Sequence, residues 1–237
     1  MYKKISHNIV EEHFAQKAGA VVYNSPYAAP ATNGSLNSTD ELPQYVLNEN
    51  TMLFRMNCRS AWMKWVYSLM NYAVSLNGNL PGTAQVKGRM HKNAVAISDI
   101  LVPYYGPTAS RLFATSLIAI DDIGMHYVEA LNKGEPTEEI VKSWAPLVED
   151  FASILHELNP GNWPTSLITD ILLSLVQAWQ DQLNARANGD FTADEIAIDT
   201  IGKLIVTGIP DHGKGFDSLA DIFSRGIIAQ FPSMFQE

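Results

Sequence analysis

The sequence predicts an all-α protein, a bundle of about six to seven helices preceded by an extended N-terminal arm. Apolar residues recur at helical spacing from residue 52 onward, and no segment sustains the apolar-polar alternation that is typical of strands. Turn-forming Asn, Gly and Pro residues divide this region into segments of about 20 residues. We therefore expect an arm over residues 1–50 and a single helical domain over residues 51–237.

The composition agrees with a folded domain and excludes several classes of function. Of 237 residues, 46% are apolar and 17% are charged, which allows a sizeable core. The net charge of -9 argues against a nucleic-acid partner, because affinity for phosphate comes from basic residues. The single cysteine, Cys58, excludes an intrachain disulfide framework and a thiolate-rich metal site. The N-terminal residues lack the apolar stretch of a secretory signal peptide, which predicts a cytoplasmic protein.

Residues 1–50 differ in character from the remainder of the chain. A short helix is predicted over residues 9–18, where Val10 and Phe14 follow helical spacing. Residues 24–50 are rich in Asn, Ser, Thr, Pro and Ala and show no sustained period. A loop of this length in a compact domain is usually a functional arm, a linker or disordered. We interpret residues 24–50 as an arm that contacts a second copy of the chain or another protein.

The first helix of the domain, over residues 52–76, is apolar on nearly every face. Such a helix is either a membrane span or the central element of a bundle. Arg55, Arg59 and Lys64 interrupt it, and only about a dozen uncharged residues follow Lys64, whereas a span needs roughly 20. We expect a buried central helix and no association with a membrane.

Helix-breaking and helix-capping residues define the other helices. The sequence NGNLPG at residues 77–82 ends the first helix, and Tyr-Tyr-Gly-Pro at residues 104–107 forms a turn. Gly134 is a predicted C-cap, and acidic residues at 138–139 favour a helix start. The expected helices cover residues 83–101, 108–131, 137–158, 165–187, 192 to about 208, and 218–229.

The helix over residues 108–131 carries the first candidate site. Asp122, His126 and Glu129 share one face of it. Carboxylate and histidine side chains on several helices are how metal sites in bundles are built. Because the apolar stripe of this helix lies on nearly the opposite side, we expect Asp122 and His126 at the surface.

The helix over residues 137–158 carries the second candidate site. Glu149 points away from its apolar stripe, whereas Asp150 lies at the edge of the stripe and could turn inward. The metal-site hypothesis therefore rests on Asp122, His126, Glu149 and Asp150. No catalytic residue and no cofactor are predicted.

Other motifs favour structural roles. Residues 208–214 match GxxxxGK, but Gly215 occupies the position where a phosphate-binding loop has Ser or Thr. Too few residues follow for a parallel α/β domain, so we expect a loop between helices. A surface site formed by Asp211, His212, Lys214 and Asp217 on this loop is an open alternative. Cys58 and the aromatic cluster formed by Trp62, Trp65, Tyr67 and Tyr72 are predicted core residues.

Several short motifs occur in a defined order. They are Tyr-Tyr-Gly at residues 104–106, Trp144 followed by Asn-Pro at residues 159–160, and Gly-Ile-Ile-Ala-Gln-Phe-Pro at residues 226–232. Taken together, they resemble a family of uncharacterised all-helical proteins found in many bacteria. The resemblance covers about residues 52–232 and implies an all-α fold.

The resemblance also has an implication for a polar site. Members of that family carry carboxylates and histidines on four helices, which implies a buried polar or metal site. The matching positions in this chain fall near residues 58–61, 119–120 and 174–175, which lack the histidines. The resemblance therefore implies a member without the family's core histidines and without its metal site. Acidic residues near matching positions are Glu149, Asp150, Glu195, Asp199 and Asp221.

These observations together predict a non-enzymatic structural or protein-interaction module. It would act through self-assembly or through binding of a protein partner, with residues 24–50 as the contact segment. The alternative is a helical bundle that binds a metal or a small ligand, or an enzyme with a carboxylate and histidine site.

Overall fold

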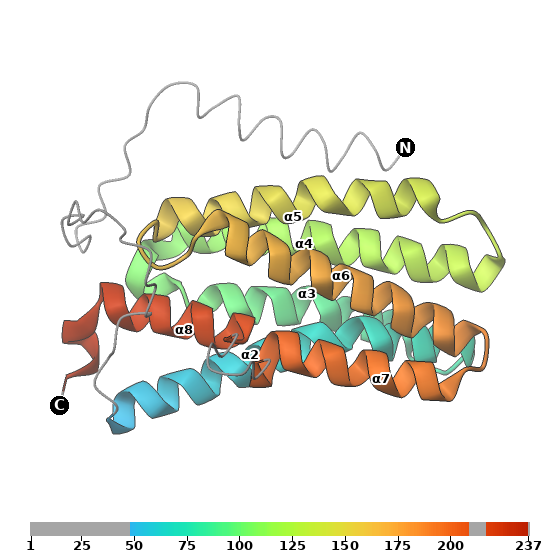
Figure 1. Cartoon of the computed structure of the whole chain (residues 1–237), viewed down its shortest axis with the longest axis horizontal. Coiled ribbons are helices and arrows are strands. Elements are labelled where there is room, and N and C mark those ends of the chain that lie inside the picture. The colour runs from blue at the N-terminus through green and yellow to red at the C-terminus, as the bar shows by residue number, and fades with distance from the viewer. Residues whose placement is uncertain (1–47, 209–216, 237) are drawn as a thin grey trace.

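The computed structural model describes residues 48–208 and 217–236, and within these residues it contains helices, turns and no strand (Figure 1). The all-α prediction is confirmed. The segments 1–47 and 209–216 lie outside the described residues, and with them lie most of the expected arm, the helix expected over residues 9–18 and most of the GxxxxGK segment. The elements are α2 (Glu49–Asn77), α3 (Thr83–Asp99), α4 (Val102–Lys133), α5 (Glu138–Leu158), α6 (Thr165–Ala187), α7 (Phe191–Gly202), the π-helical turn η1 (Lys203–Thr207), α8 (Leu219–Gln230) and the 3-10 turn η2 (Pro232–Phe235).

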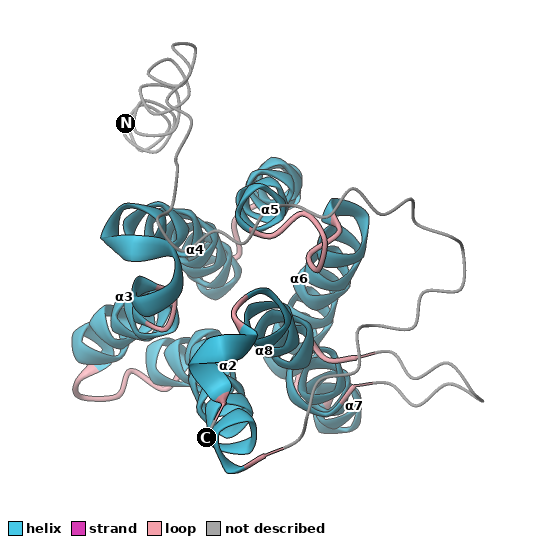
Figure 2. Cartoon of the chain, turned by 90° about the vertical axis from the view of Figure 1, so that its left-hand side faces the viewer, coloured by secondary structure: helices cyan, strands magenta, loops and turns pink. Residues whose placement is uncertain are grey.

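The helices run roughly along a common axis and surround one core (Figures 1 and 2). In the end-on view, α4, α5 and α6 lie on one side, and α2, α7 and α8 lie on the other (Figure 2). Helix α2 packs against α3, α4 and α8. It therefore contacts both sides of the bundle while lying at its lower edge in Figure 1.

The start of α2 is fixed by its own cap and by the C-terminal segment. The Asn48 side chain accepts a hydrogen bond from the Thr51 backbone N–H at 2.9 Å, and Thr51 Oγ1 accepts one from the Asn48 N–H at 3.0 Å. This reciprocal cap satisfies two of the N–H groups that a helix start leaves unpaired. Asn48 Nδ2 also donates to the Phe235 carbonyl at 2.7 Å. As a result, α2 begins three residues before the expected position, and η2 is attached to its first turn.

The break at Gly106 and the cap at Gly134 lie where the sequence predicts them, but α4 begins at Val102 and not at the expected residue 108, because residues 102–105 form a further helical turn. Gly106 has φ 79° and ψ 170°, which breaks the helical path inside α4 immediately before Pro107. Gly134 caps α4 with φ 69°, as expected for a helix that ends in the left-handed conformation. The helix expected from residue 192 begins one residue earlier as α7, continues through η1 and ends at Gly208 with φ 75°.

Aromatic side chains form the core along the length of the bundle. Trp62, Trp65, Trp144 and Trp163 are fully buried. The rings of Trp62 and Trp65 meet edge to face at 5.5 Å, and Trp163 stacks on Phe223 at 5.4 Å. Such pairs contribute about 0.5–1.5 kcal/mol each beyond the burial of their area. The prediction that the aromatic residues of α2 are core residues is confirmed for Trp62, Trp65 and Tyr72, whereas Tyr67 is half-buried.

Apart from Trp144, which packs against Tyr127 and Trp179, the motifs singled out in the sequence meet at one end of the bundle. Tyr105, at the Tyr-Tyr-Gly turn, donates to the Gln230 side chain at 2.5 Å. Asn159, from the Asn-Pro pair, donates to the Gly226 carbonyl at 2.8 Å. The Trp163 indole donates to the Ile222 carbonyl at 3.1 Å. These bonds join the start of α4, the turn between α5 and α6, and α8, so the motifs have a structural role at a shared junction.

Gly226 is the position in this junction that tolerates a side chain least. A Cβ atom there would lie 2.1 Å from Nε1 of Trp163, whose ring is held by the core. We predict that Gly226→Ala lowers the free energy of unfolding by about 1–3 kcal/mol or more, although alanine is the better helix former.

Gly88 in α3 is the matched control, since a Cβ atom there meets nothing within 4 Å. Gly88→Ala should raise the free energy of unfolding by up to about 1 kcal/mol. Urea unfolding of both variants checks the prediction. Equal effects of the two substitutions would show that the close contact with Trp163 does not limit position 226.

Candidate interaction surface

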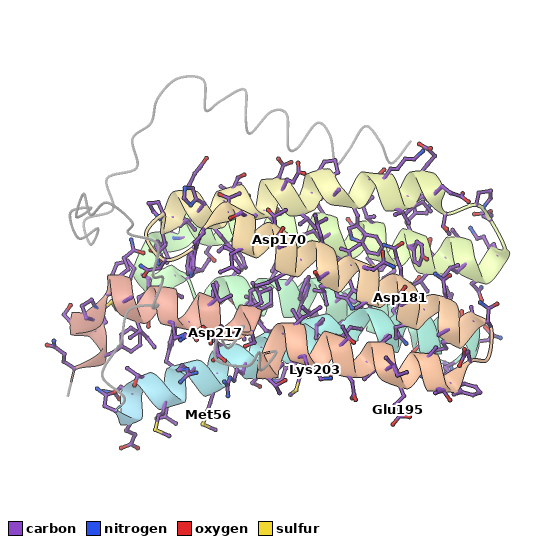
Figure 3. All side chains as sticks on the ribbon, viewed as in Figure 1. Met56, Asp170, Asp181, Glu195, Lys203 and Asp217 are labelled. Carbon is purple, nitrogen blue, oxygen red and sulfur yellow. The ribbon has the colours of Figure 1, made fainter. Side chains whose placement is uncertain are left out.

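One side of α2 is apolar and exposed to solvent, contrary to the expectation of a fully buried helix. The side chains of Met52, Met56, Met63 and Val74 are 50%, 62%, 41% and 37% exposed. Their spacing of four, seven and eleven residues places them on one side of the helix. Figure 3 shows Met56 pointing away from the bundle, on its lower side. We define the methionine face as Met52, Leu53, Met56, Met63, Met70 and Val74.

The methionine face differs from ordinary scattered exposure of apolar residues. Single exposed apolar side chains are normal on a protein surface, whereas a contiguous row is typical of an interaction site. The row from Met52 to Val74 spans about 33 Å of helix; Arg59 and Ser60 separate Met56 from Met63 along it, and Met70 is half-buried. Methionine is unbranched and polarizable, so a surface rich in it adapts to the shape of a partner. Other exposed large apolar side chains among the described residues are spread over other segments: Leu80, Val95, Val102, Phe191, Ile196 and Met234.

Two arginines on the flank of the methionine face bind a buried carboxylate on α8. Arg55 Nη2 lies 2.9 Å from Asp221 Oδ1, and Arg59 Nη2 lies 2.6 Å from Asp221 Oδ2. The Ser218 hydroxyl donates to Asp221 Oδ2 at 3.1 Å. We refer to Arg55, Arg59, Ser218 and Asp221 as the arginine clamp. It connects α2 to α8 across the bundle interface.

The charge on Asp221 is stabilised in place. Burial alone would raise the pKa of its carboxyl, but hydrogen bonds and positive charge from Arg59 and Arg55 outweigh burial and lower the pKa below its usual value. Because Asp221 is buried, loss of both arginines would leave its charge uncompensated, and an uncompensated buried charge typically costs about 3–5 kcal/mol. The clamp therefore fixes the backbone that presents the methionine face.

The basic residues of α2 make its exposed side less acidic than the chain as a whole. Helix α2 carries three basic residues and one acidic residue, Glu49, in a chain with a net charge of -9. Lys64 is exposed on the flank opposite Arg59. A partner surface that meets the methionine face therefore meets basic side chains on both flanks.

Cys58 lies on α2 beside the clamp but belongs to the core. It is 0% exposed, and burial, together with the charge of Asp221, raises the pKa of its thiol. Reactive cysteines require a thiolate and access to solvent, so Cys58 is a packing residue, as the sequence predicts.

Asp121 on α4 is a buried carboxyl that the sequence analysis did not single out. It is 3% exposed, and its Oδ2 atom has no hydrogen-bond partner in the described structure. Burial raises the pKa of Asp121 well above its usual value. The nearby Trp65 indole, which lacks regular hydrogen-bond geometry, offsets only part of this rise, and the negative charge of Asp122 increases the pKa further. Helical spacing would have predicted the burial of Asp121, because it lies four residues after Leu117, on the apolar stripe of α4.

The four candidate metal ligands do not form a site. Asp122 and His126 are exposed on α4, and Asp122 Oδ1 pairs with His91 Nε2 of α3 at 2.9 Å. Glu149 is exposed on α5, and Asp150 is half-buried. Across residues 48–208 and 217–236, no group of three or more His, Cys, Asp or Glu side chains could hold a metal ion. The other acidic residues near matching positions lie apart: Asp221 in the clamp, and Glu195 and Asp199 exposed on α7.

Comparison with protein-family models, with curated proteins and with solved structures found no match to this chain. The resemblance to a family of bacterial helical proteins therefore stays a prediction. In the part of the chain that the structure describes, no helix is long and apolar enough to cross a bilayer.

Burial of Asp121 predicts an unusual dependence of stability on pH. The pKa of an unfolded aspartate is about 3.9, and the pKa of the folded group is higher. The folded chain therefore holds a proton that the unfolded chain releases, and stability falls as pH rises from about 4 to the folded pKa, by up to about 1.4 kcal/mol per pH unit. We predict that Asp121→Asn is more favourable relative to the wild type at about pH 8 than at about pH 4, as measured by urea unfolding.

Asp170→Asn is the matched control, because Asp170 is exposed on α6 (Figure 3). Its effect should stay within about 0.5 kcal/mol at both pH values. An effect of Asp121→Asn that does not change with pH would contradict the prediction.

Proposed function

We propose that this protein is a non-enzymatic helical interaction module that assembles by binding a second copy of itself through the methionine face. The observation that carries this proposal is the alignment of exposed apolar side chains along one side of α2. Most oligomers of soluble proteins are symmetric and use the same patch on each copy, and an adaptable apolar row suits such self-recognition.

The size of the face sets the expected strength of association. Completing the burial of a half-exposed Met or Leu contributes on the order of 1 kcal/mol. Two copies of the face contribute roughly 10 kcal/mol, which is comparable with the estimated 4–15 kcal/mol lost in translational and rotational freedom. We therefore expect a concentration-dependent dimer, strengthened where other segments add contacts.

Contacts on both sides of the methionine face hold α2 in its position in the bundle. The arginine clamp attaches α2 to α8, and the cap at Asn48 attaches it to η2. Because the backbone under the face is held from two sides, little conformational freedom is lost there on association.

A charge placed on the face tests the proposal. Met56→Glu would bury a carboxylate in the dimer, and because the neighbouring guanidinium groups of Arg55 and Arg59 already bind Asp221, its burial should cost several kcal/mol. We predict that the wild type gives a dimer and that Met56→Glu gives a monomer in native mass spectrometry, with the dissociation constant raised at least about tenfold, since each tenfold corresponds to about 1.4 kcal/mol.

Val95→Glu is the matched control, because Val95 is a 40% exposed apolar residue on α3, outside the face. It should leave the dimer intact. Circular dichroism would establish that both variants are folded. A wild type that stays monomeric at all concentrations, or a Met56→Glu dimer as stable as the wild type, would refute self-association through this face.

The arm is the second part of the proposal, as the sequence predicts for residues 24–50. The chain enters α2 at Asn48, one turn before Met52, so the arm starts beside the face. Deleting residues 1–47 should weaken the dimer without abolishing it, because contacts made by the arm would be lost and the methionine face would remain. An unchanged dissociation constant in analytical ultracentrifugation would remove the arm from the interface.

The same native mass spectrum addresses the alternative function, a metal- or small-ligand-binding bundle. A bound ion or ligand in protein purified without chelator adds its mass to each chain. Because the structure does not bring Asp122, His126, Glu149 and Asp150 together, the ligands in that case would include other residues.

A further inference from the structure

We propose that the methionine face is a site of reversible oxidation by peroxides, and that conversion of its exposed methionines to the sulfoxide weakens self-association. The effect on assembly rests on the proposed self-association, whereas the oxidation itself requires only that the sulfur atoms be accessible in the free chain. Two observations carry the inference: where the chain exposes its sulfur atoms, and which kinds of side chain surround them on the face.

The methionines of the chain are concentrated on one side of one helix. The chain has eight methionines, and four of them, Met52, Met56, Met63 and Met70, belong to the methionine face of α2. Met52, Met56 and Met63 are exposed to solvent, Met56 most of all. Because a peroxide is a small molecule that reacts at the sulfur atom, these three thioethers are open to it in the free chain.

The other methionines that the structure describes provide a contrast. Met90 on α3 and Met125 on α4 are 1% and 2% exposed, so the core shields their sulfur atoms. Met234 is exposed on η2, outside the face. The folded chain therefore contains buried methionines as internal references and one exposed methionine away from α2.

Cys58, the single thiol of the chain, is shielded from peroxide. It is 0% exposed, and burial, together with the charge of Asp221, raises the pKa of its thiol. Peroxides oxidise the accessible thiolate form of cysteine, which Cys58 does not offer. A thioether needs no deprotonation, so the methionines of the face are the sulfur atoms that react.

Oxidation by hydrogen peroxide is a two-electron oxygen transfer. The thioether sulfur attacks one oxygen of the peroxide, the S–O bond forms as the O–O bond breaks, and the departing hydroxide takes up the remaining proton to give water. The sulfur is oxidised by two electrons, and the peroxide is reduced by two. Methionine sulfoxide reductases reverse the change with two thiols, which become a disulfide while the oxygen leaves as water.

The sulfoxide is incompatible with an apolar contact between two copies. Its oxygen accepts hydrogen bonds, and the side chains of the face, which are Met, Leu and Val, cannot donate one. Burial of that oxygen would therefore remove its hydration without replacing it. Because both copies use the same face, each oxidised position affects the dimer twice. We expect oxidation to raise the dissociation constant of the dimer at least about tenfold.

Assembly and oxidation then oppose each other. Burial in the dimer shields the sulfur atoms, and oxidation of the free chain draws the equilibrium away from the dimer. At a chain concentration ten times the dissociation constant, mass action leaves roughly one fifth of the chains free. Peroxide should therefore oxidise Met56 about fivefold more slowly there than at high dilution.

Treatment of the full-length chain with dilute hydrogen peroxide tests the inference, with peptide mass spectrometry and analytical ultracentrifugation as readouts. Sulfoxide should form at Met52, Met56 and Met63 before it forms at Met90 and Met125, and the dissociation constant should rise at least about tenfold. Reductases that act on both sulfoxide epimers should return the constant to within about twofold of its starting value. Such a reversal excludes irreversible damage as the cause.

Substitution with leucine locates the effect. The triple variant Met52→Leu, Met56→Leu, Met63→Leu keeps apolar side chains of similar volume but has no sulfur at these positions. Whatever its own dissociation constant is, peroxide should change that constant by less than about twofold. Met234→Leu is the matched control, because it removes an exposed methionine outside the face. It should keep the full response of the wild type.

Sulfoxide at Met56 that leaves the dissociation constant unchanged would overturn the effect on assembly while leaving self-association intact. A rise that the reductases do not reverse, or an equal response of the triple variant, would do the same. A wild type that is monomeric at all concentrations would refute self-association and, with it, the effect on assembly. The order of oxidation then decides the modification site alone, which is refuted if Met56 reacts no faster than the buried Met90.

Discussion

The attachment of α8 to α2 through the arginine clamp is the interaction on which the rest of the arrangement depends. Asp221 lies in the first turn of α8, where its negative charge also suits the helix dipole. Two arginines from consecutive turns of α2 share this one carboxylate, and Ser218 caps α8 beside it. The clamp therefore fixes both the rotation of α2 and the start of α8. A rotation of α2 by a fraction of a turn would break both ion pairs and would also move the methionine face toward the core.

Aromatic packing provides a second contact between α2 and α8. The rings of Trp62 and Phe223 meet at 5.6 Å across the α2–α8 interface, so the same two helices are joined by a charged contact near the surface and by an apolar contact within the core. The buried junction of Tyr105, Asn159 and Gln230 then joins α8 to α4 and to the end of α5. In this way α8, one of the shorter helices, connects both sides of the bundle.

Two of the buried carboxyls, those of Asp221 and Asp121, are accommodated in opposite ways. Asp221 keeps its charge because two guanidinium groups compensate for lost hydration. Asp121 has no such partner, and burial favours its protonated form. Stability therefore depends on proton uptake at one site and on charge pairing at the other. Neither residue is exposed enough to bind a partner, so the surface that we propose for recognition, on the outer side of α2, is separate from both carboxyls.

The sequence alone determined the helical class, most helix boundaries and most of the core. Local chemistry is sufficient for these features, because Gly106, Gly134 and the Asn-Pro-Gly turn at residues 159–161 act within a few residues of their own position. The helical phase of the sequence also placed Asp122 and His126 at the surface. Only the tertiary structure decided which side of α2 stays uncovered and which carboxyls are buried. The α2 segment is apolar on nearly every face, so its pattern does not distinguish the exposed Met56 from the buried Trp62. Which side of α2 is buried depends on the helices that pack against it, and above all on the carboxylate of Asp221, which is more than 160 residues away along the chain.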